Sequence, residues 1–227
     1  IIDPSRCTSC GKCREVCRFD AISEEFTVNR RSCEGCGACY VLCPAGAVDF
    51  PASLAGSCYI CRDKDSGHFV YAELLPGEEN SGKLVAMVRN EARELAEKNG
   101  VGLVLIDGPP GIGCPVIASL TGATAVLAVT EPTLSGEHDL GRVLSLARHF
   151  EIPSAVCVNR ADVDVEIAAR IEARAAEAGA TVLPRVRFDR AVTDAQARER
   201  PVVELDGSGA AEDLRKVWGV LWGMLRK

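Results

Sequence analysis

The segments CTSCGKCREVC (residues 7–17) and CEGCGACYVLC (residues 33–43) decide how the first part of this chain folds. Both follow the pattern CxxCxxCxxxC, and the second begins 26 residues after the first, so the chain contains an internal repeat. Three thiolates on a tight, glycine-containing loop suit three irons of a cubane cluster, while the fourth cysteine reaches across to the other cluster. A zinc ribbon is the alternative, but zinc sites normally use two separated CxxC pairs. The repeat therefore favours iron-sulfur clusters.

This part of the chain resembles the bacterial two-cluster ferredoxins, and the resemblance covers residues 1–50. It implies two [4Fe-4S] clusters, one held by Cys7, Cys10, Cys13 and Cys43 and the other by Cys33, Cys36, Cys39 and Cys17. The sequence departs from the ferredoxin pattern at Arg18, which follows Cys17 where proline is expected, whereas Cys43 keeps Pro44. Because proline is no ligand, this departure concerns the geometry of the loop and the cluster potential rather than cluster binding.

Size and composition are those of a folded intracellular protein. With 227 residues and 47% hydrophobic side chains, the chain is long enough for one α/β core and a small second domain. Its net charge of -6 argues against a nucleic-acid surface. No apolar run reaches the roughly 18 to 20 residues that span a bilayer, and the start resembles no secretion signal, so we expect no stable membrane insertion and a cytoplasmic location. Crowding at metal-cluster spacing makes the cysteines thiolate ligands rather than disulfide partners.

Strands alternate with helices from residue 68 onward. We expect strands over residues 68–75, 101–107, 123–130 and 154–159, with a helix over residues 83–98. The run VGLVLID (residues 101–107) is almost continuously apolar, which is typical of a strand buried on both faces of a parallel sheet. The expected fold class is therefore α/β, with a doubly wound, mostly parallel sheet and a ligand at its carboxyl edge.

Asp107 ends one of these strands, within VLIDGPPGIGCP. A carboxylate there suits a Walker B residue that orients Mg²⁺, and the following glycine-rich loop, which includes Gly111, suits a switch that responds to a phosphate. The alternative is an aspartate that caps the next helix. A Rossmann interpretation fails, because the loop lacks GxGxxG.

Three segments carry a second resemblance: DGPPGIGCPVIASLTGA (residues 107–123), VTEPTLSGEHDLGRV (residues 129–143) and VNRAD (residues 158–162). They are similar to the MinD-type P-loop ATPases, specifically to members with an inserted two-cluster ferredoxin domain. The resemblance implies a ferredoxin domain at residues 1–50 and an ATPase domain at residues 51–227. It also implies that Asp107 serves the metal and catalysis, that Gly111 and Asn159 contact ATP, and that the protein dimerises with itself or a related ATPase.

The segment GEENSGKLV (residues 77–85) nearly matches the phosphate-loop pattern GxxxxGK[ST], but it has Leu84 where a hydroxyl is needed. We interpret it as a turn in which Asn80 or Ser81 caps the following helix. The resemblance places the phosphate loop KGGxGKT ahead of the ferredoxin insert, and these residues do not contain it. We therefore expect an N-terminal strand and phosphate loop to be missing from this chain.

Four further cysteines leave alternatives open. Cys114 lies seven residues after Asp107, where a nitrogenase-type relative has a cluster ligand, so it is either a packing thiol or a ligand of a cluster shared by two subunits. Cys58 and Cys61 are either half of a metal site or ordinary thiols, and Cys157 is expected in the core. Apolar residues at helical spacing near the C-terminus predict an amphipathic helix that packs on the sheet rather than on a membrane.

The leading hypothesis is an ATP-dependent iron-sulfur protein in which hydrolysis gates electron delivery from the clusters to a redox partner protein. A ferredoxin-like carrier on a scaffold that no longer hydrolyses ATP is the first alternative. An assembly factor that hands clusters to other proteins is the second.

Overall fold

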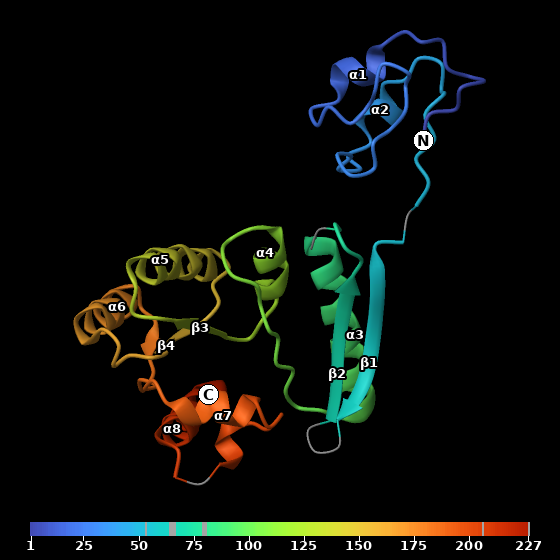
Figure 1. Cartoon of the computed structure of the whole chain (residues 1–227). Helices are drawn as coiled ribbons and strands as arrows, with labels where there is room; N and C mark the ends of the chain where they lie inside the picture. The colour runs from blue at the N-terminus through green and yellow to red at the C-terminus, as the bar shows by residue number, and fades with distance from the viewer. Residues whose placement is uncertain (53, 64–66, 79–80, 206, 227) are drawn as a thin grey trace. The chain divides into compact units, whose positions relative to one another are not determined.

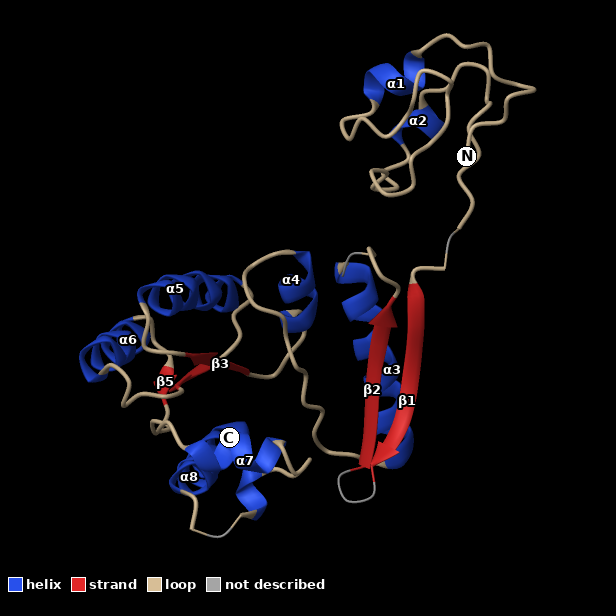
Figure 2. Cartoon of the chain, viewed as in Figure 1, coloured by secondary structure: helices blue, strands red, loops and turns tan. Residues whose placement is uncertain are grey.

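A computed structural model describes residues 1–52, 54–63, 67–78, 81–205 and 207–226. The chain divides into two compact units, one of residues 1–58 and 72–79 and the other of residues 59–71 and 80–227. The boundary passes through a two-stranded sheet, β1 (Gly56–Asp63) and β2 (Gly67–Leu74), whose arrows run in opposite directions in Figure 2. The strand predicted over residues 68–75 is thus present as β2.

The first unit is built from the cysteine repeat. Over residues 1–52, the regular structure consists of two short helices, α1 (Lys12–Val16) and α2 (Ala38–Val41), and two antiparallel bridges. One bridge joins Ile2 to Val48 and the other joins Ile22 to Val28. The two bridges are equivalent, because Val28 lies 26 residues after Ile2 and Ile22 lies 26 residues before Val48. The small core obeys the same repeat, with Ala21 and Ala47 almost completely buried. The unit is therefore approximately two-fold symmetric in its backbone.

The second unit contains a three-stranded parallel sheet in the order β3 (Val126–Thr130), β4 (Ser154–Val158), β5 (Thr181–Val182). Val156 and Val158 of β4 pack with α5 (Leu134–His149) and α6 (Val165–Glu177). Ala155 and Cys157 pack instead with α8 (Gly209–Leu225). Successive side chains of a strand point to opposite faces, so β4 is covered by helices on both faces (Figure 1). This is a mixed α/β fold with a parallel sheet.

Two further helices of this unit contact each other, α3 (Gly82–Asn99) and α4 (Cys114–Leu120). The Ser81 hydroxyl accepts a hydrogen bond from the Leu84 N–H at 3.3 Å, which confirms the predicted cap, while the alternative cap Asn80 lies outside the described residues. Arg89 of α3 donates to the Thr121 carbonyl at 2.7 Å and so caps the end of α4. Helix α7 (Arg190–Gln196) and the short 3-10 helix η1 (Val202–Glu204) complete the unit.

The strand predicted over residues 101–107 is wrong. The segment forms no ladder in the described structure, and its apolar side chains are exposed, up to 84% for Leu105. An apolar run forms a buried parallel strand only where neighbouring strands accept its backbone and helices cover its side chains. Among the described residues, no strand pairs with this segment.

The C-terminal amphipathic helix is confirmed as α8, and it packs on the sheet as predicted. Val217 and Leu221 are buried beside β4, whereas Trp218 and Trp222 are partly exposed and stack on each other at 5.6 Å. Within the part of the chain that the structure describes, no helix combines the length and apolar character needed to cross a bilayer.

Ile171 tests whether the packing against β4 holds the second unit together. It is 0% exposed and lies in the cluster of α5, α6 and β4. We expect Ile171→Ala to lower the free energy of unfolding by about 2–5 kcal/mol, because it leaves a cavity in a close-packed core. Val165→Ala on the same helix is the matched control, since Val165 is 56% exposed. Urea unfolding followed by circular dichroism measures both variants, and equal costs would contradict the assignment of this core.

Candidate metal centres

Two cavities in the first unit collect the eight cysteines of the repeat. The first cavity is lined by Cys7, Cys10, Cys13 and Cys43. The second cavity is lined by Cys17, Cys33, Cys36 and Cys39. Each cavity therefore combines three cysteines of one repeat with the fourth cysteine of the other.

The three-cysteine loops adopt the same backbone conformation in both repeats. Ser9 and Gly35 have φ of 53° and 61°, and Gly11 and Gly37 have φ of 77° and 75°. These left-handed residues bend the chain tightly between successive cysteines, so that the side chains at the three positions turn toward one volume. Gly11 and Gly37 then start the short helices that carry Cys13 and Cys39.

The turns after the fourth cysteines also match, and we call residues 17–21 the Cys17 turn and residues 43–47 the Cys43 turn. In the Cys43 turn, the Ala47 N–H donates to the Cys43 Sγ at 3.3 Å and Gly46 has a φ of 58°. In the Cys17 turn, the Ala21 N–H donates to the Cys17 Sγ at 3.4 Å and Asp20 has a φ of 51°. The replacement of proline by Arg18 therefore leaves the turn geometry unchanged.

The four cysteines of each set line one cavity. Among the described residues, no three His, Cys, Asp or Glu side chains gather as they would around one metal ion. A zinc ion needs four ligands at about 2.0–2.3 Å from one centre. A four-iron cluster takes one thiolate at each of four separate irons, so four cysteines that line a cavity fit it better.

Burial and hydrogen bonding separate the cysteines by their acidity. The Ala47 N–H is the main cause that lowers the pKa of the Cys43 thiol below its ordinary value. Burial raises the pKa of Cys13 and of Cys39. The thiol pKa is thus lowered by backbone hydrogen bonding at Cys43 and raised by burial at Cys13 and Cys39.

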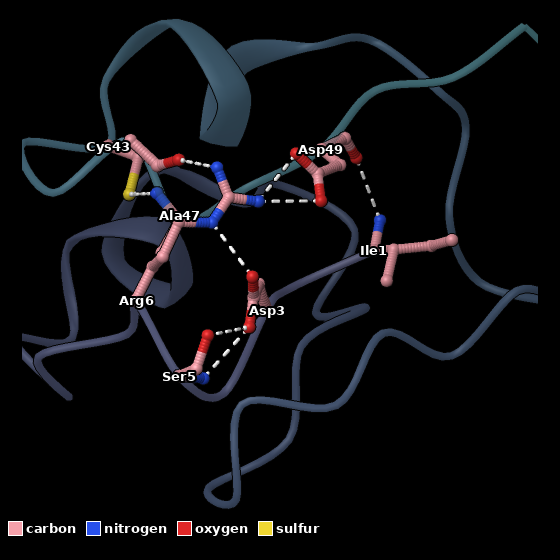
Figure 3. A network of polar contacts seen from close by, with 8 residues as sticks. Ile1, Asp3, Ser5, Arg6, Cys43, Ala47 and Asp49 are labelled. Carbon is pink, nitrogen blue, oxygen red and sulfur yellow. Dashed lines mark hydrogen bonds and ion pairs between the residues drawn. The ribbon is translucent and has the colours of Figure 1, made fainter.

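Arg6 lies between the N-terminal segment that leads to Cys7 and the Cys43 turn (Figure 3). Its guanidinium donates to Asp3, to the Gly46 carbonyl and to both carboxylate oxygens of Asp49. The Ser5 hydroxyl, followed by Arg6, lowers the pKa of Asp3 to about 2, which keeps that carboxylate ionised. Sequence reasoning missed Arg6, although one signal was available: the equivalent position of the second repeat is Ser32.

The surfaces of the two halves differ although their backbones match. On the first half, Arg14 forms an ion pair with Glu24 at 3.4 Å. The equivalent residues 26 positions later are Tyr40 and Phe50, whose rings stack at 6.0 Å and which are 53% and 54% exposed. One pair of equivalent positions is thus ionic and the other aromatic.

The residues predicted to bind nucleotide lie in the second unit. Asn159 follows β4, and its N–H donates to the carbonyl of Thr130 at the end of β3, so it lies at the carboxyl edge of the sheet. Asp107 is exposed on the irregular segment before α4, and Gly111 has a φ of 91° in the following loop. Among the described residues, no hydrogen bond or ion pair joins Asp107 to Asn159.

Sequence reasoning missed the contacts around Arg160, beside Asn159. Arg160 is left-handed with a φ of 53°, pairs with Glu131 at 3.4 Å and lies 6.0 Å from the ring centre of Phe188. Its position directly after a strand that ends in asparagine is the only sequence signal.

The remaining cysteines are also placed. Cys58 and Cys61 are three residues apart on strand β1, so their side chains point to opposite faces and cannot bind the same ion in this conformation. Cys157 is buried in β4 as predicted, and burial raises its pKa to about 11. Cys114 is exposed at the start of α4, where its backbone lies against Gly82. The first residue of α3 therefore lies against the first residue of α4.

Comparisons with known proteins find one family match and several similar proteins. The family model of a 4Fe-4S binding domain matches residues 1–23 and 26–49. The uncharacterized protein MJ0578 of Methanocaldococcus jannaschii is 35% identical over 154 residues, which are 68% of this chain and 53% of that protein. The uncharacterized ferredoxin MJ0155 of the same organism is 29% identical over 111 residues, 40% of this chain and 74% of that protein.

A chain of the MinC:MinD cell division protein complex of Aquifex aeolicus has a similar fold, with a TM-score of 0.54 and 21% identity, over 72% of this chain and 66% of that one. The chain thus carries a 4Fe-4S binding domain together with a MinD-like α/β fold. It spans about half the length of MJ0578.

The left-handed residues of the two turns provide a test of this geometry. We expect Gly46→Ala to destabilise the first unit by about 1–2 kcal/mol, because a Cβ is unfavourable at a left-handed φ. Asp20→Gly should stabilise the unit by up to about 1 kcal/mol for the converse reason. The temperature at which cluster absorbance is lost measures both variants. A lower temperature for Asp20→Gly than for the unsubstituted protein would count against equivalent turns.

Proposed function

We propose that the chain is an electron carrier that holds two [4Fe-4S] clusters, one in each cavity. The observation that carries this proposal is the lining of each cavity by three cysteines of one repeat and the fourth cysteine of the other. The match of the 4Fe-4S binding model to both repeats supports it. So does the similarity to a protein named as a ferredoxin. The proposed ligands are the eight cysteines predicted from the sequence.

A bound [4Fe-4S] cluster supplies one-electron chemistry, and the protein sets its potential through hydrogen bonds, charge and solvent exposure. In this chain, the Ala21 and Ala47 N–H groups donate to the fourth cysteine of each set. Phe26 lines the first cavity, and Phe19 and Phe50 line the second, where their rings restrict the access of water. These residues make the two sites suitable for electron transfer without ligand exchange.

The finer part of the proposal concerns ATP and the whole protein. We infer that the ferredoxin domain is inserted into a MinD-type ATPase and that ATP binding and hydrolysis gate electron delivery to a redox partner protein. Asp107 orients Mg²⁺, Gly111 belongs to the switch loop, and Asn159 contacts the base. The MinD-like fold and the position of Asn159 at the carboxyl edge support this part. Dimerisation with itself or a related ATPase belongs to the same proposal.

A carrier that does not hydrolyse ATP is the second candidate. The observation that favours it is the exposed, irregular segment around Asp107, which no hydrogen bond or ion pair joins to Asn159 in the described structure. In this case the cluster part of the proposal stands unchanged, because it rests on the first unit alone.

Double substitutions test which cysteines share a cluster. We expect about eight irons per chain in the unsubstituted protein and about four after Cys7→Ala, because losing one ligand releases one cluster. Adding Cys43→Ala should cost no further iron, since both residues line the first cavity. Adding Cys17→Ala instead should remove nearly all iron. Iron and sulfide analysis with EPR of the dithionite-reduced protein gives the result.

The opposite pattern, in which the Cys7 and Cys17 double variant keeps half of the iron, would show that each repeat binds its own cluster. A chain that binds zinc in place of iron after anaerobic reconstitution would refute the proposed function altogether.

Asp107→Asn tests the nucleotide part of the proposal. The substitution removes the negative charge that orients Mg²⁺, so we expect ATP hydrolysis to fall to background while the cluster absorbance is unchanged. Asp162→Asn is the control, because the Asp162 carboxylate accepts the Phe188 N–H and belongs to no proposed metal site. Hydrolysis at an unchanged rate in Asp107→Asn would contradict the role of Asp107, whereas background hydrolysis in the unsubstituted protein would favour the second candidate.

A further inference from the structure

Both polar groups of the peptide unit between Gly46 and Ala47 form hydrogen bonds. Its carbonyl, on Gly46, accepts a hydrogen bond from the Arg6 Nη1 at 2.8 Å. Its N–H, on Ala47, donates to the Cys43 Sγ at 3.3 Å. Because a trans peptide is planar and its C=O and N–H point in opposite directions, a donor that fixes the carbonyl also aims the N–H. Arg6 therefore determines how this N–H meets the sulfur (Figure 3).

The charge of Arg6 adds to this geometric effect. A cationic donor on the carbonyl polarises the peptide group, which strengthens the hydrogen bond that the same group donates at its other end. The side chain is held at three points, since its Nε bonds Asp3 at 2.8 Å and its Nη2 bonds Asp49 at 2.7 Å. Only the planar fork of an arginine makes these contacts together.

Among the described residues, the second cavity has no equivalent of the hydrogen bond from Arg6 to the turn carbonyl. Its equivalent peptide group lies between Asp20 and Ala21 and donates to the Cys17 Sγ at 3.4 Å. The residue equivalent to Arg6 is Ser32, and among the described residues no side chain donates to the Asp20 carbonyl. The charged residues on the cavity walls also differ, because the cationic Lys12 lines the first cavity and the anionic Glu34 lines the second.

We propose that Arg6 is a positioning residue that raises the reduction potential of the cluster in the first cavity above that of the cluster in the second. A reduced cluster carries one more negative charge, which a stronger N–H···S hydrogen bond stabilises. An electron shared by the two clusters thus resides mainly in the first cavity. This inference rests on the proposed function, because it requires a cluster in each cavity.

The test uses the full chain with reconstituted clusters and measures midpoint potentials by EPR-monitored redox titration. Cys17→Ala removes the cluster of the second cavity and Cys43→Ala that of the first, so each potential is measured alone. In the Cys17→Ala background, we expect Arg6→Gln to lower the midpoint potential. Arg6→Lys should restore only part of the loss, because it keeps the charge but not the fork. In the Cys43→Ala background, Arg6→Gln should have a smaller effect.

Two control variants separate Arg6 from general charge effects. Arg14→Gln removes an exposed arginine of the same unit that is paired with Glu24, and it should leave the first potential unchanged. Asp49→Asn neutralises a carboxylate on the wall of the second cavity while its amide oxygen can still accept from Arg6, so it should raise the second potential.

The proposal is overturned by equal shifts in the two backgrounds, by the same shift in Arg14→Gln, or by full rescue in Arg6→Lys. If Arg6→Gln fails to fold, the comparison of Arg6→Lys with Arg14→Gln decides. Failure of the proposed function has a different signature, since the unsubstituted chain then lacks the two clusters before any Arg6 variant is made.

Discussion

The pairing of the first and last segments of the cysteine repeat is the interaction on which both metal centres depend. Ile2 lies five residues before Cys7, and its partner Val48 lies five residues after Cys43. The bridge therefore brings the start of one ligand set next to its fourth member, and the pair Ile22 and Val28 does the same for Cys17 and Cys33. Two backbone bridges thus connect cysteines that are distant in sequence, and the buried Ala21 and Ala47 keep the connection tight.

The second unit depends on a different constraint, the burial of β4 on both faces. Its alternate side chains belong to two separate apolar clusters, so the strand cannot shift by one residue without exchanging the two sets. Such a fixed register also fixes the strand's carboxyl end. Asn159 is consequently held at the carboxyl edge of the sheet by the packing of β4 and by backbone pairing with Thr130 and Val186.

The features predicted correctly from the sequence are those with local causes. Cysteine spacing within each repeat, the Ser81 cap and the apolar stripe of α8 all depend on residues within a few turns of each other. The strand expected over residues 101–107 failed because an apolar run reports a need for burial, not whether neighbouring strands are present to meet it. Arg6 was missed for a related reason. Its role depends on Gly46, 40 residues away, and only the fold brings the two together.

The left-handed Asp20 lies between these cases. Glycine is the usual residue at a left-handed φ, and Gly46 is found there in the Cys43 turn. Because the Cys17 turn has Asp20 instead, only its position after Cys17 indicated that the two turns are equivalent. The predicted division at residue 50 stays a prediction, as do the roles of Asp107, Gly111 and Asn159.

The unlike pairs Arg14–Glu24 and Tyr40–Phe50 give the first unit a polarity that its backbone does not have. A half-turn about the approximate two-fold axis superposes the loops, the turns and the bridges, yet it exchanges an ion pair for two aromatic rings. The two halves of the first unit therefore share one backbone shape but differ in the chemistry of their surfaces. The unlike side chains at equivalent positions allow a solvent molecule, an ion or another protein to distinguish one half from the other.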